Sequence, residues 1–170
     1  MTVTYRDATP ADLIAVDALF RDSFVATFAH LYDPADLAAF LAQFTPEAWA
    51  GELAQPDLSI RLAERGDGTL IGFAKVSDVE LPVETTGPTL ELRQLYLANV
   101  AKGQGVADAL TQWVKDQARA RGAETIVLSV YKDNDRAKRF YARHGFAYVK
   151  PYAFKVGEQY DEDEIWTLKL

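Results

Sequence analysis

The sequence predicts an α/β (α+β) fold, with a single mixed, mostly antiparallel sheet of six to seven strands and helices on both faces. Three observations predict it. Helix signals fill the N-terminal third, short β-prone segments follow, and a long amphipathic helix then separates two strand-like segments. The chain has 170 residues, which suits one domain spanning residues 1–170 and is enough to bury a sizeable core.

The N-terminal third is predicted to be one short strand followed by three helices. The strand covers Val3–Arg6, a β-prone segment. Each helix is opened by a Thr-Pro or Asp-Pro pair, which supplies an N-cap residue and a proline at the first helical position. Apolar residues at helical spacing extend the first helix to about Ala29, and the two shorter ones cover about 34–42 and 46–54.

The middle of the chain has the sequence pattern of a β-meander. Ser59–Arg65 roughly alternates between apolar and polar residues, and Leu70–Val79 is again strand-like. Asp67-Gly68 between them is a turn sequence, so the two segments are predicted to form a hairpin. Residues 80–88 are expected to be a loop, and Leu90–Leu97 a further strand.

The last part of the chain alternates helices and strands. The strand–helix–strand unit over 90–131 is expected to form a right-handed parallel crossover. Glycines that follow two helical patterns mark helix ends. The predicted elements are helices over Gln104–Arg121 and Asp135–His144, and strands over Thr125–Tyr131, Phe146–Val156 and Ile165–Leu170.

Composition excludes several classes of function. The formal net charge of -7 argues against nucleic acid and anionic membranes as partners, and it is compatible with a cationic substrate. Cysteine is absent, which excludes disulfides, thiolate zinc sites and cysteine nucleophiles. Two histidines, His30 and His144, give no basis for a metal site. Without a signal sequence or an apolar run of ~20 residues, we expect a cytoplasmic protein.

A glycine-containing turn between a strand and a helix is the most informative segment. Gly103 and Gly105 can adopt positive φ, and the first N–H groups of the following helix have no intrahelical partners. Lys102 adds a positive charge, so the turn suits an anion such as a diphosphate. A glycine turn used for geometry alone is the alternative. Two common phosphate motifs fail, since Lys-Ser/Thr does not follow Gly105 and Asp108 replaces the third glycine of GxGxxG.

The turn also resembles the acetyl-CoA signature of the GNAT N-acetyltransferase superfamily, [Q/R]xxGx[G/A]. Lys102 stands where that family usually has arginine or glutamine, and Ala107 is an allowed ending. The resemblance implies that main-chain groups of the preceding strand bind the acetyl carbonyl and the pantetheine, and that the turn holds the diphosphate. The implied cofactor residues are Leu95, Tyr96, Leu97, Lys102, Gly103, Gln104, Gly105, Val106, Ala107 and Asp108.

A second segment, Val130–Phe146, resembles the next motif of the same family, N-x-x-A-x-x-[FL]-Y-x-x-x-G-F. Its matching residues are Asn134, Ala137, Phe140, Tyr141, Gly145 and Phe146. Spacing alone favours Tyr141 as a half-buried core aromatic and allows Asn134 as a helix cap. The resemblance implies that both contact the cofactor, and that Tyr141 is the general acid that protonates the departing CoA thiolate. Together the motifs cover about residues 60–170 and imply the GNAT acyl-CoA acyltransferase fold.

The implied reaction moves an acetyl group from acetyl-CoA to a primary amine by direct attack through a tetrahedral intermediate. An alkyl ammonium with a pKa near ~10.4 must first lose a proton, so a base is needed. Glu91 is the candidate, six residues before Leu97. Strand alternation predicts that it shares a face with Arg93 and Leu95. A water chain to solvent is the alternative, with Glu91 an ordinary strand glutamate.

The acceptor region is predicted to lie in the N-terminal helices, over Ser23–Trp49. The helical spacing of its aromatic residues favours packing in the core as the first interpretation. The segment also resembles bacterial polyamine acetyltransferases, which favours a small polyamine-like acceptor and implies Phe28, His30 and Tyr32 as pocket residues. Two alternative functions remain open: acetylation of a protein or peptide, and a non-catalytic role as an acyl-CoA sensor. The aromatic C-terminal hairpin, with Tyr148 and Tyr160, makes a homodimer conceivable.

Overall fold

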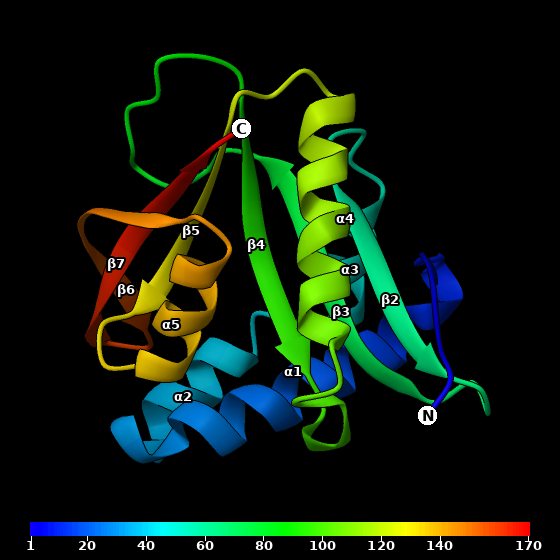
Figure 1. Cartoon of the computed structure of the whole chain (residues 1–170). Coiled ribbons are helices and arrows are strands. Elements are labelled where there is room, and N and C mark those ends of the chain that lie inside the picture. Colours follow the sequence, from blue (N-terminus) through cyan, green and yellow to red (C-terminus); the bar gives the residue numbers. More distant parts are fainter.

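The computed structural model describes residues 1–170 and contains one seven-stranded sheet in the order β1-β2-β3-β4-β5-β7-β6 (Figure 1). Only β4 and β5 pair in parallel, and every other neighbouring pair is antiparallel. The predicted fold class is thereby confirmed. The strands are β1 (Val3–Asp7), β2 (Ser59–Arg65), β3 (Leu70–Asp78), β4 (Thr89–Leu97), β5 (Thr125–Tyr131), β6 (Ala147–Val156) and β7 (Gln159–Lys169).

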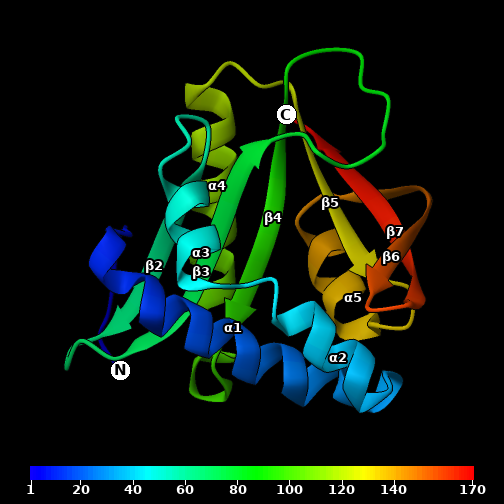
Figure 2. The same cartoon turned by 180° about the vertical axis from the view of Figure 1, so that it is seen from behind.

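Five α-helices cover the two faces of the sheet. The N-terminal three lie on one face and the other two on the opposite face, as the front and back views show (Figures 1 and 2). None of them is long and apolar enough to cross a membrane. The helices are α1 (Leu13–Phe28), α2 (Pro34–Leu41), α3 (Pro46–Leu53), α4 (Val106–Ala120) and α5 (Asp135–Arg143).

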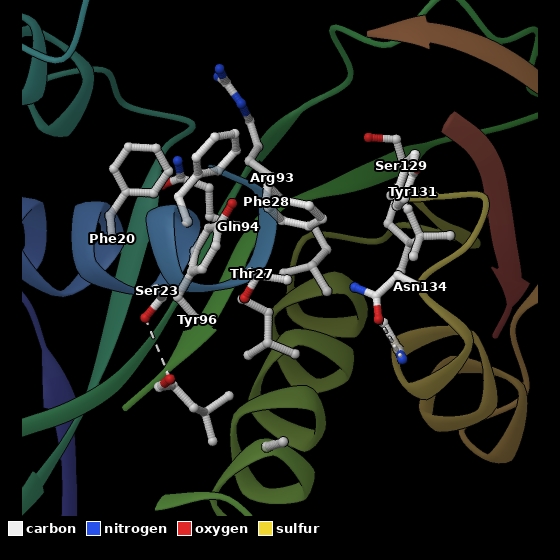
Figure 3. Close-up of a pocket in the computed structure, with 18 of the residues that line it drawn as sticks. Phe20, Ser23, Thr27, Phe28, Arg93, Gln94, Tyr96, Ser129, Tyr131 and Asn134 are labelled. Atoms are coloured by element: carbon white, nitrogen blue, oxygen red, sulfur yellow. Dashed lines mark hydrogen bonds between the residues drawn. The ribbon is translucent and has the colours of Figure 1, made fainter. Parts of the chain in front are cut away.

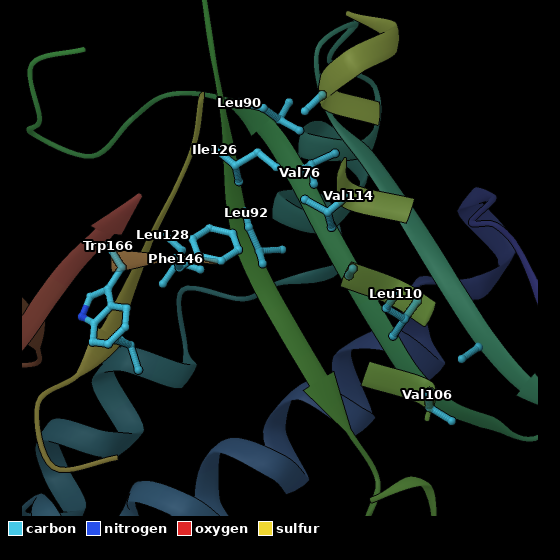
Figure 4. Packing of buried hydrophobic residues seen from close by; sticks show 14 of the residues in the cluster. Val76, Leu90, Leu92, Val106, Leu110, Val114, Ile126, Leu128, Phe146 and Trp166 are labelled. Carbon is cyan, nitrogen blue, oxygen red and sulfur yellow. The ribbon is translucent and has the colours of Figure 1, made fainter. Parts of the chain in front are cut away.

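Each face of the sheet has its own hydrophobic core. The helical period places Leu110 and Val114 of α4 in the same buried cluster as Val76 and Leu92 of the sheet, on the face that α5 also covers (Figure 4). On the other face, Phe20 of α1 and Trp49 of α3 are buried together. Full burial of such a side chain contributes about 1.5–3 kcal/mol, so both layers are firmly held to the sheet.

The centre of the sheet opens where β4 and β5 diverge. Their pairing covers only Thr89–Glu91 against Thr125–Val127, at the start of each strand. Beyond Glu91 the two strands separate, which leaves the second half of β4 without a partner on that side (Figure 1). Unpaired main-chain groups of β4 therefore border the opening.

A β-bulge in β4 corrects one expectation about this opening. Lys75 of β3 lies opposite Gln94, whereas the next residue, Val76, lies opposite Leu92. Arg93 is the extra residue, and it shifts the alternation of the strand by one. Leu95 consequently packs on the α4 side, whereas Glu91 pairs with Ser77 on the α1–α3 side. The predicted common face of Glu91 and Leu95 was wrong, because strict alternation ends at the bulge.

The last strand is also longer than predicted. β7 begins at Gln159 rather than at Ile165, because its acidic first half pairs with β6 and, from Asp163 onward, with β5. The segment Tyr160–Glu164 contains almost no apolar residue, which makes it look like a loop in the sequence. Its main-chain hydrogen bonds to two neighbours hold it in the sheet regardless of that polarity.

Candidate active site

A cavity of about 1110 Å³ passes through the opening between β4 and β5 (Figure 3). It is bordered by α1 on one side of the sheet and by the N-terminus of α4 and the face of α5 on the other. β6 and β7 complete its wall. A cavity of this size, partly apolar and with several polar groups, is typical of a small-molecule site.

The turn before α4 presents a row of free main-chain donors to the cavity. Gly103 and Gly105 have φ values of 73° and 76°, in the left-handed region that glycine adopts without strain. The N–H groups of Gly103, Gly105, Val106, Ala107 and Asp108 donate to no acceptor in the protein. A Cβ at either glycine would meet no atom within 4 Å, so the space above these donors is open. This arrangement fits a diphosphate.

Positive side chains flank these donors. Lys102 borders the cavity and makes no ion pair. Arg136, Arg139 and Arg143 of α5 border it as well, because a spacing of three and four residues puts them on one helix face. Arg143 also donates to Asp108, 3.3 Å away. These arginines were not predicted as site residues, although their helical spacing was a usable signal.

Asp108 itself is held by residues near the end of the second motif. Its Oδ1 lies 2.7 Å from Nε2 of His144, and this hydrogen bond is the main reason that the pKa of Asp108 is below its usual value. The contact ties the N-terminus of α4 to the C-terminal end of α5. Of the other predicted turn residues, Gln104 is exposed and Val106 is buried in the core, so their side chains do not border the cavity.

Tyr141 lies on the face of α5 that borders the cavity, half-buried among aromatic neighbours. Its ring packs edge-on against Phe140 and Phe146, with centroids 5.4 and 5.7 Å away. Burial raises the pKa of its phenol, so the hydroxyl stays protonated at neutral pH. A protonated hydroxyl at a cavity wall is a group that can give up a proton to a basic leaving group.

Asn134 caps α5, as one of its two predicted roles required, and its contact with the cofactor stays a prediction. Its Oδ1 accepts the N–H of Ala137 at 3.2 Å and so caps α5. The residue also borders the cavity beside β5, where Figure 3 shows it near Tyr131. The cap uses only the oxygen, and the amide nitrogen keeps two donors for a ligand.

Glu91 borders the cavity at the point where β4 and β5 begin to diverge, and it is only 6% exposed. Its Oε2 accepts the N–H groups of Glu80 and Leu81 at 2.6 and 3.0 Å. The carboxylate thus anchors the loop between β3 and β4. One of its two oxygens, Oε1, has no such partner.

The three predicted acceptor residues do not stay together. Phe28 and Tyr32 border the cavity. His30, between them, is exposed and lies outside the cavity lining. The reason is local: α1 ends at Phe28 and continues as a short 3-10 turn over Ala29–Leu31, which turns His30 toward solvent.

Two buried carboxylates on β7 were not predicted as site residues. Asp161 and Asp163 are each 8% exposed and both border the cavity. Tyr32 donates its hydroxyl hydrogen bond to Asp161. Burial and the neighbouring charges of Asp161 and Glu164 raise the pKa of Asp163 to about 7. The only sequence signal was the alternation of acidic residues in YDEDE.

Residues 15–146, most of the chain and nearly the whole cavity lining, match the model of the acetyltransferase (GNAT) family. The chain belongs to this family. It is an acetyl-CoA-dependent N-acetyltransferase. The predicted family, enzyme class and co-substrate are therefore confirmed at this level.

Two relatives and one solved structure illustrate the similarity. An uncharacterised N-acetyltransferase of Lactobacillus delbrueckii subsp. lactis is 27% identical over 154 residues, which cover 89% of this chain and 88% of the relative. One from Mycobacterium tuberculosis is 31% identical over 138 residues, covering 81% and 84%. The PaiA N-acetyltransferase of Thermoplasma acidophilum, solved with coenzyme A, shares the fold with a TM-score of 0.80 at 20% identity and full coverage of both chains.

Proposed function

We propose that this N-acetyltransferase acetylates a primary amine of a small molecule, with polyamine-like amines favoured. The observation that carries the proposal is one continuous cavity with two different halves. The half at α4 offers free main-chain donors for the diphosphate of the co-substrate. The half at α1 and β7 is closed by aromatic rings and carries buried carboxylates, which suits a compact cation better than an extended peptide.

In the half of the cavity at α4, each group has a proposed role in binding the co-substrate. The turn residues from Lys102 to Asp108 hold the diphosphate by main-chain donors, with Lys102 adding its charge. The unpaired edge of β4 at Leu95, Tyr96 and Leu97 receives the pantetheine arm and the acetyl carbonyl by main-chain hydrogen bonds. Asn134 contacts the same arm from across the opening through its amide nitrogen.

The chemistry is direct aminolysis of a thioester. The neutral amine nitrogen attacks the carbonyl carbon, the C–N bond forms, and a main-chain amide of β4 stabilises the oxyanion of the tetrahedral intermediate. The C–S bond then breaks, and Tyr141 donates its hydroxyl proton to the departing sulfur. The proton that the nitrogen loses as the neutral amide forms passes, directly or through solvent, to the phenolate of Tyr141 and restores its hydroxyl. Burial raises the pKa of Tyr141, so the phenol is in its protonated form when the thiolate leaves.

Glu91 is the proposed base for the ammonium proton. It lies on the acceptor side of the sheet, buried at the start of the opening. Its Oε2 is engaged by two loop amides, whereas Oε1 can accept a proton. A water chain from the cavity to solvent is the competing route, and it needs no side-chain base.

The deciding experiment measures CoA release with acetyl-CoA and a panel of acceptors that includes polyamines, amino acids, aminosugars, a ribosomal N-terminal peptide and a lysine peptide. We expect turnover with one class of small amines. Turnover with the peptides alone would instead assign a protein acetyltransferase. Tight acetyl-CoA binding without turnover on any acceptor would assign an acyl-CoA sensor.

A further inference from the structure

The first half of β7 divides its acidic side chains between two environments. Glu162 is exposed and forms an ion pair with Lys132 on the outer surface. Asp161 and Asp163, on either side of it in the sequence, point the other way and are more than nine-tenths buried. Strand alternation alone thus selects two of these acids and directs them into the cavity.

Asp163 has no hydrogen-bond or ion-pair partner, although charged groups that are this buried are almost always paired. Tyr32 satisfies its neighbour Asp161, and nothing in the protein does the same for Asp163. The cations that border the acceptor side are already used, since Lys75 pairs with Glu52 and Arg93 with Glu80. The protein therefore leaves one buried carboxyl group without a partner, available to a group that enters the cavity.

The surroundings of Asp163 are suited to an organic cation. Asp163 lies directly opposite Tyr131 on β5 and opposite Tyr152 on β6, and both tyrosines border the cavity. The ring of Phe28 meets that of Tyr131 edge-on, with centroids 6.1 Å apart. Aromatic faces beside a desolvated carboxylate attract ammonium groups and reject anions.

The nitrogen that is acetylated is a poor partner for this carboxylate. A carboxylate beside an ammonium raises the pKa of that ammonium, which opposes the deprotonation that attack requires. The same nitrogen becomes an uncharged amide in the product. An ammonium group elsewhere on the acceptor keeps its charge throughout the reaction, so it can pair with the carboxylate in substrate and product alike.

We propose that Asp163, supported by Asp161 and Tyr32, binds a second, non-reacting ammonium group of the acceptor, so that the enzyme selects diamines and longer polycations over monoamines. This inference rests on the proposed function and adds the residue that determines specificity. It assigns Asp163 a binding role, with the proton chemistry left to other groups.

The affinity of Asp163 for an ammonium group should depend on pH in a defined direction. With a pKa of about 7, Asp163 is protonated in the free protein at lower pH and must lose its proton to pair with an ammonium. Diamine affinity should therefore fall as the pH is lowered below 7, approaching tenfold per unit. The titratable groups that face Asp163 from the surrounding elements are Tyr32, Tyr96, Tyr131 and Tyr152. On β7 itself its charged neighbours are Asp161 and Glu164, and Glu164 is paired with Lys138.

The test compares α,ω-diamines from 1,3-diaminopropane to 1,6-diaminohexane with the amino alcohols of equal chain length. In the wild-type enzyme we expect kcat/KM for the best diamine to exceed that of its amino alcohol by roughly 10- to 100-fold, the value of a charge-assisted hydrogen bond. Asp163→Asn should reduce this ratio to within a few-fold. Glu162→Gln, one residue away on the outer face, is the matched control and should keep it.

A titration calorimeter supplies a readout that needs no turnover. The same diamine, added to protein saturated with coenzyme A, should bind the wild type and bind Asp163→Asn at least tenfold more weakly. The proposal is overturned if the variant keeps the diamine preference, if it loses diamine and amino-alcohol activity by one factor, or if the wild type binds no diamine. Failure of the proposed function looks different, because the protein then fails to bind coenzyme A or acetylates no amine.

Discussion

The two ends of the cavity are suited to opposite charges, and for different structural reasons. At the N-terminus of α4, five main-chain N–H groups around Gly103 and Gly105 point into open space and need no side chain to attract an anion. At β7, the charge would belong to the side chain of Asp163, which is buried, borders the cavity and has no protein partner. The free donors at α4 result from backbone conformation, whereas the unpaired carboxyl group at β7 results from side-chain packing.

This difference has consequences for stability. The donors at α4 add little cost to the empty protein, since water can reach them. The unpaired carboxylate at β7 destabilises the folded state whenever it is charged, which is common at functional sites. Substitutions at the two ends should therefore change binding alike but change stability in opposite directions.

The largest expected effect lies between the two ends. Tyr141→Phe should lower kcat by about 10²–10³-fold, because a positioned general acid typically contributes 10²–10⁴ in rate. Coenzyme A affinity and Tm should change little, as the ring keeps its contacts with Phe140 and Phe146. Steady-state kinetics with Tyr148→Phe, an exposed position, as control would check this. An unchanged kcat would assign the proton to water.

Glu91→Gln is expected to lower kcat/KM by about 10²-fold if the carboxylate is the base. The glutamine oxygen can still accept the N–H groups of Glu80 and Leu81, so the loop should stay in place. The measurement is the pH profile of kcat/KM, alongside that of Glu84→Gln in the exposed loop. A full rate with an unaltered profile would favour the water chain over Glu91.

At the α4 end, Gly105→Ala should weaken coenzyme A binding by about tenfold or more, because a Cβ enters the space above the free donors. Alanine at this φ of 76° also costs about 1–2 kcal/mol of stability. Gly122→Ala, with a φ of 73° at the other end of α4, carries the same strain away from the cavity. Equal losses of affinity in the two variants would mean that strain, not access to the donors, explains the effect.

At the β7 end, Asp163→Asn should raise Tm by several degrees at pH 8, since ~1 kcal/mol shifts the midpoint of a domain of this size by about 2–4 °C. The pKa of Asp163 is raised to about 7 in the folded protein, so the folded state binds this proton more tightly than the unfolded chain. Stability of the wild type therefore falls as the pH rises from about 4 to 7. The gain from Asn should shrink at pH 5 in thermal scans, and a lower Tm at pH 8 would contradict the account.

Much of the fold was predictable because its signals are local. The proline-containing helix starts, the hairpin turn at Asp67-Gly68 and the long apolar face of α4 each depend on a few neighbouring residues. The α4 turn was predictable for the same reason, since glycines mark a backbone that must take positive φ. The single-domain span, the cytoplasmic location and the homodimer stay predictions.

The acceptor half was predicted less well because its residues depend on contacts distant in sequence. Tyr32 meets Asp161 across 129 positions, and no local pattern links them. The bulge at Arg93 shifted the faces of β4, and a 3-10 turn moved His30 out of the cavity. The contact, the bulge and the 3-10 turn all depend on how one element packs against another, which the periodicity of apolar residues in the sequence does not indicate.

The sequence by itself determined the family and the co-substrate. It also predicted where the diphosphate binds, because main-chain donors are created by glycine positions and helix starts that are written in neighbouring residues. Only the tertiary structure decided which acids become buried. Asp161, Glu162 and Asp163 are chemically similar and consecutive, and the pairing of β7 with β5 and β6 turns two of them inward. Loss of water around those two raises the pKa of both carboxyl groups, which on a solvated strand would be ordinary surface acids.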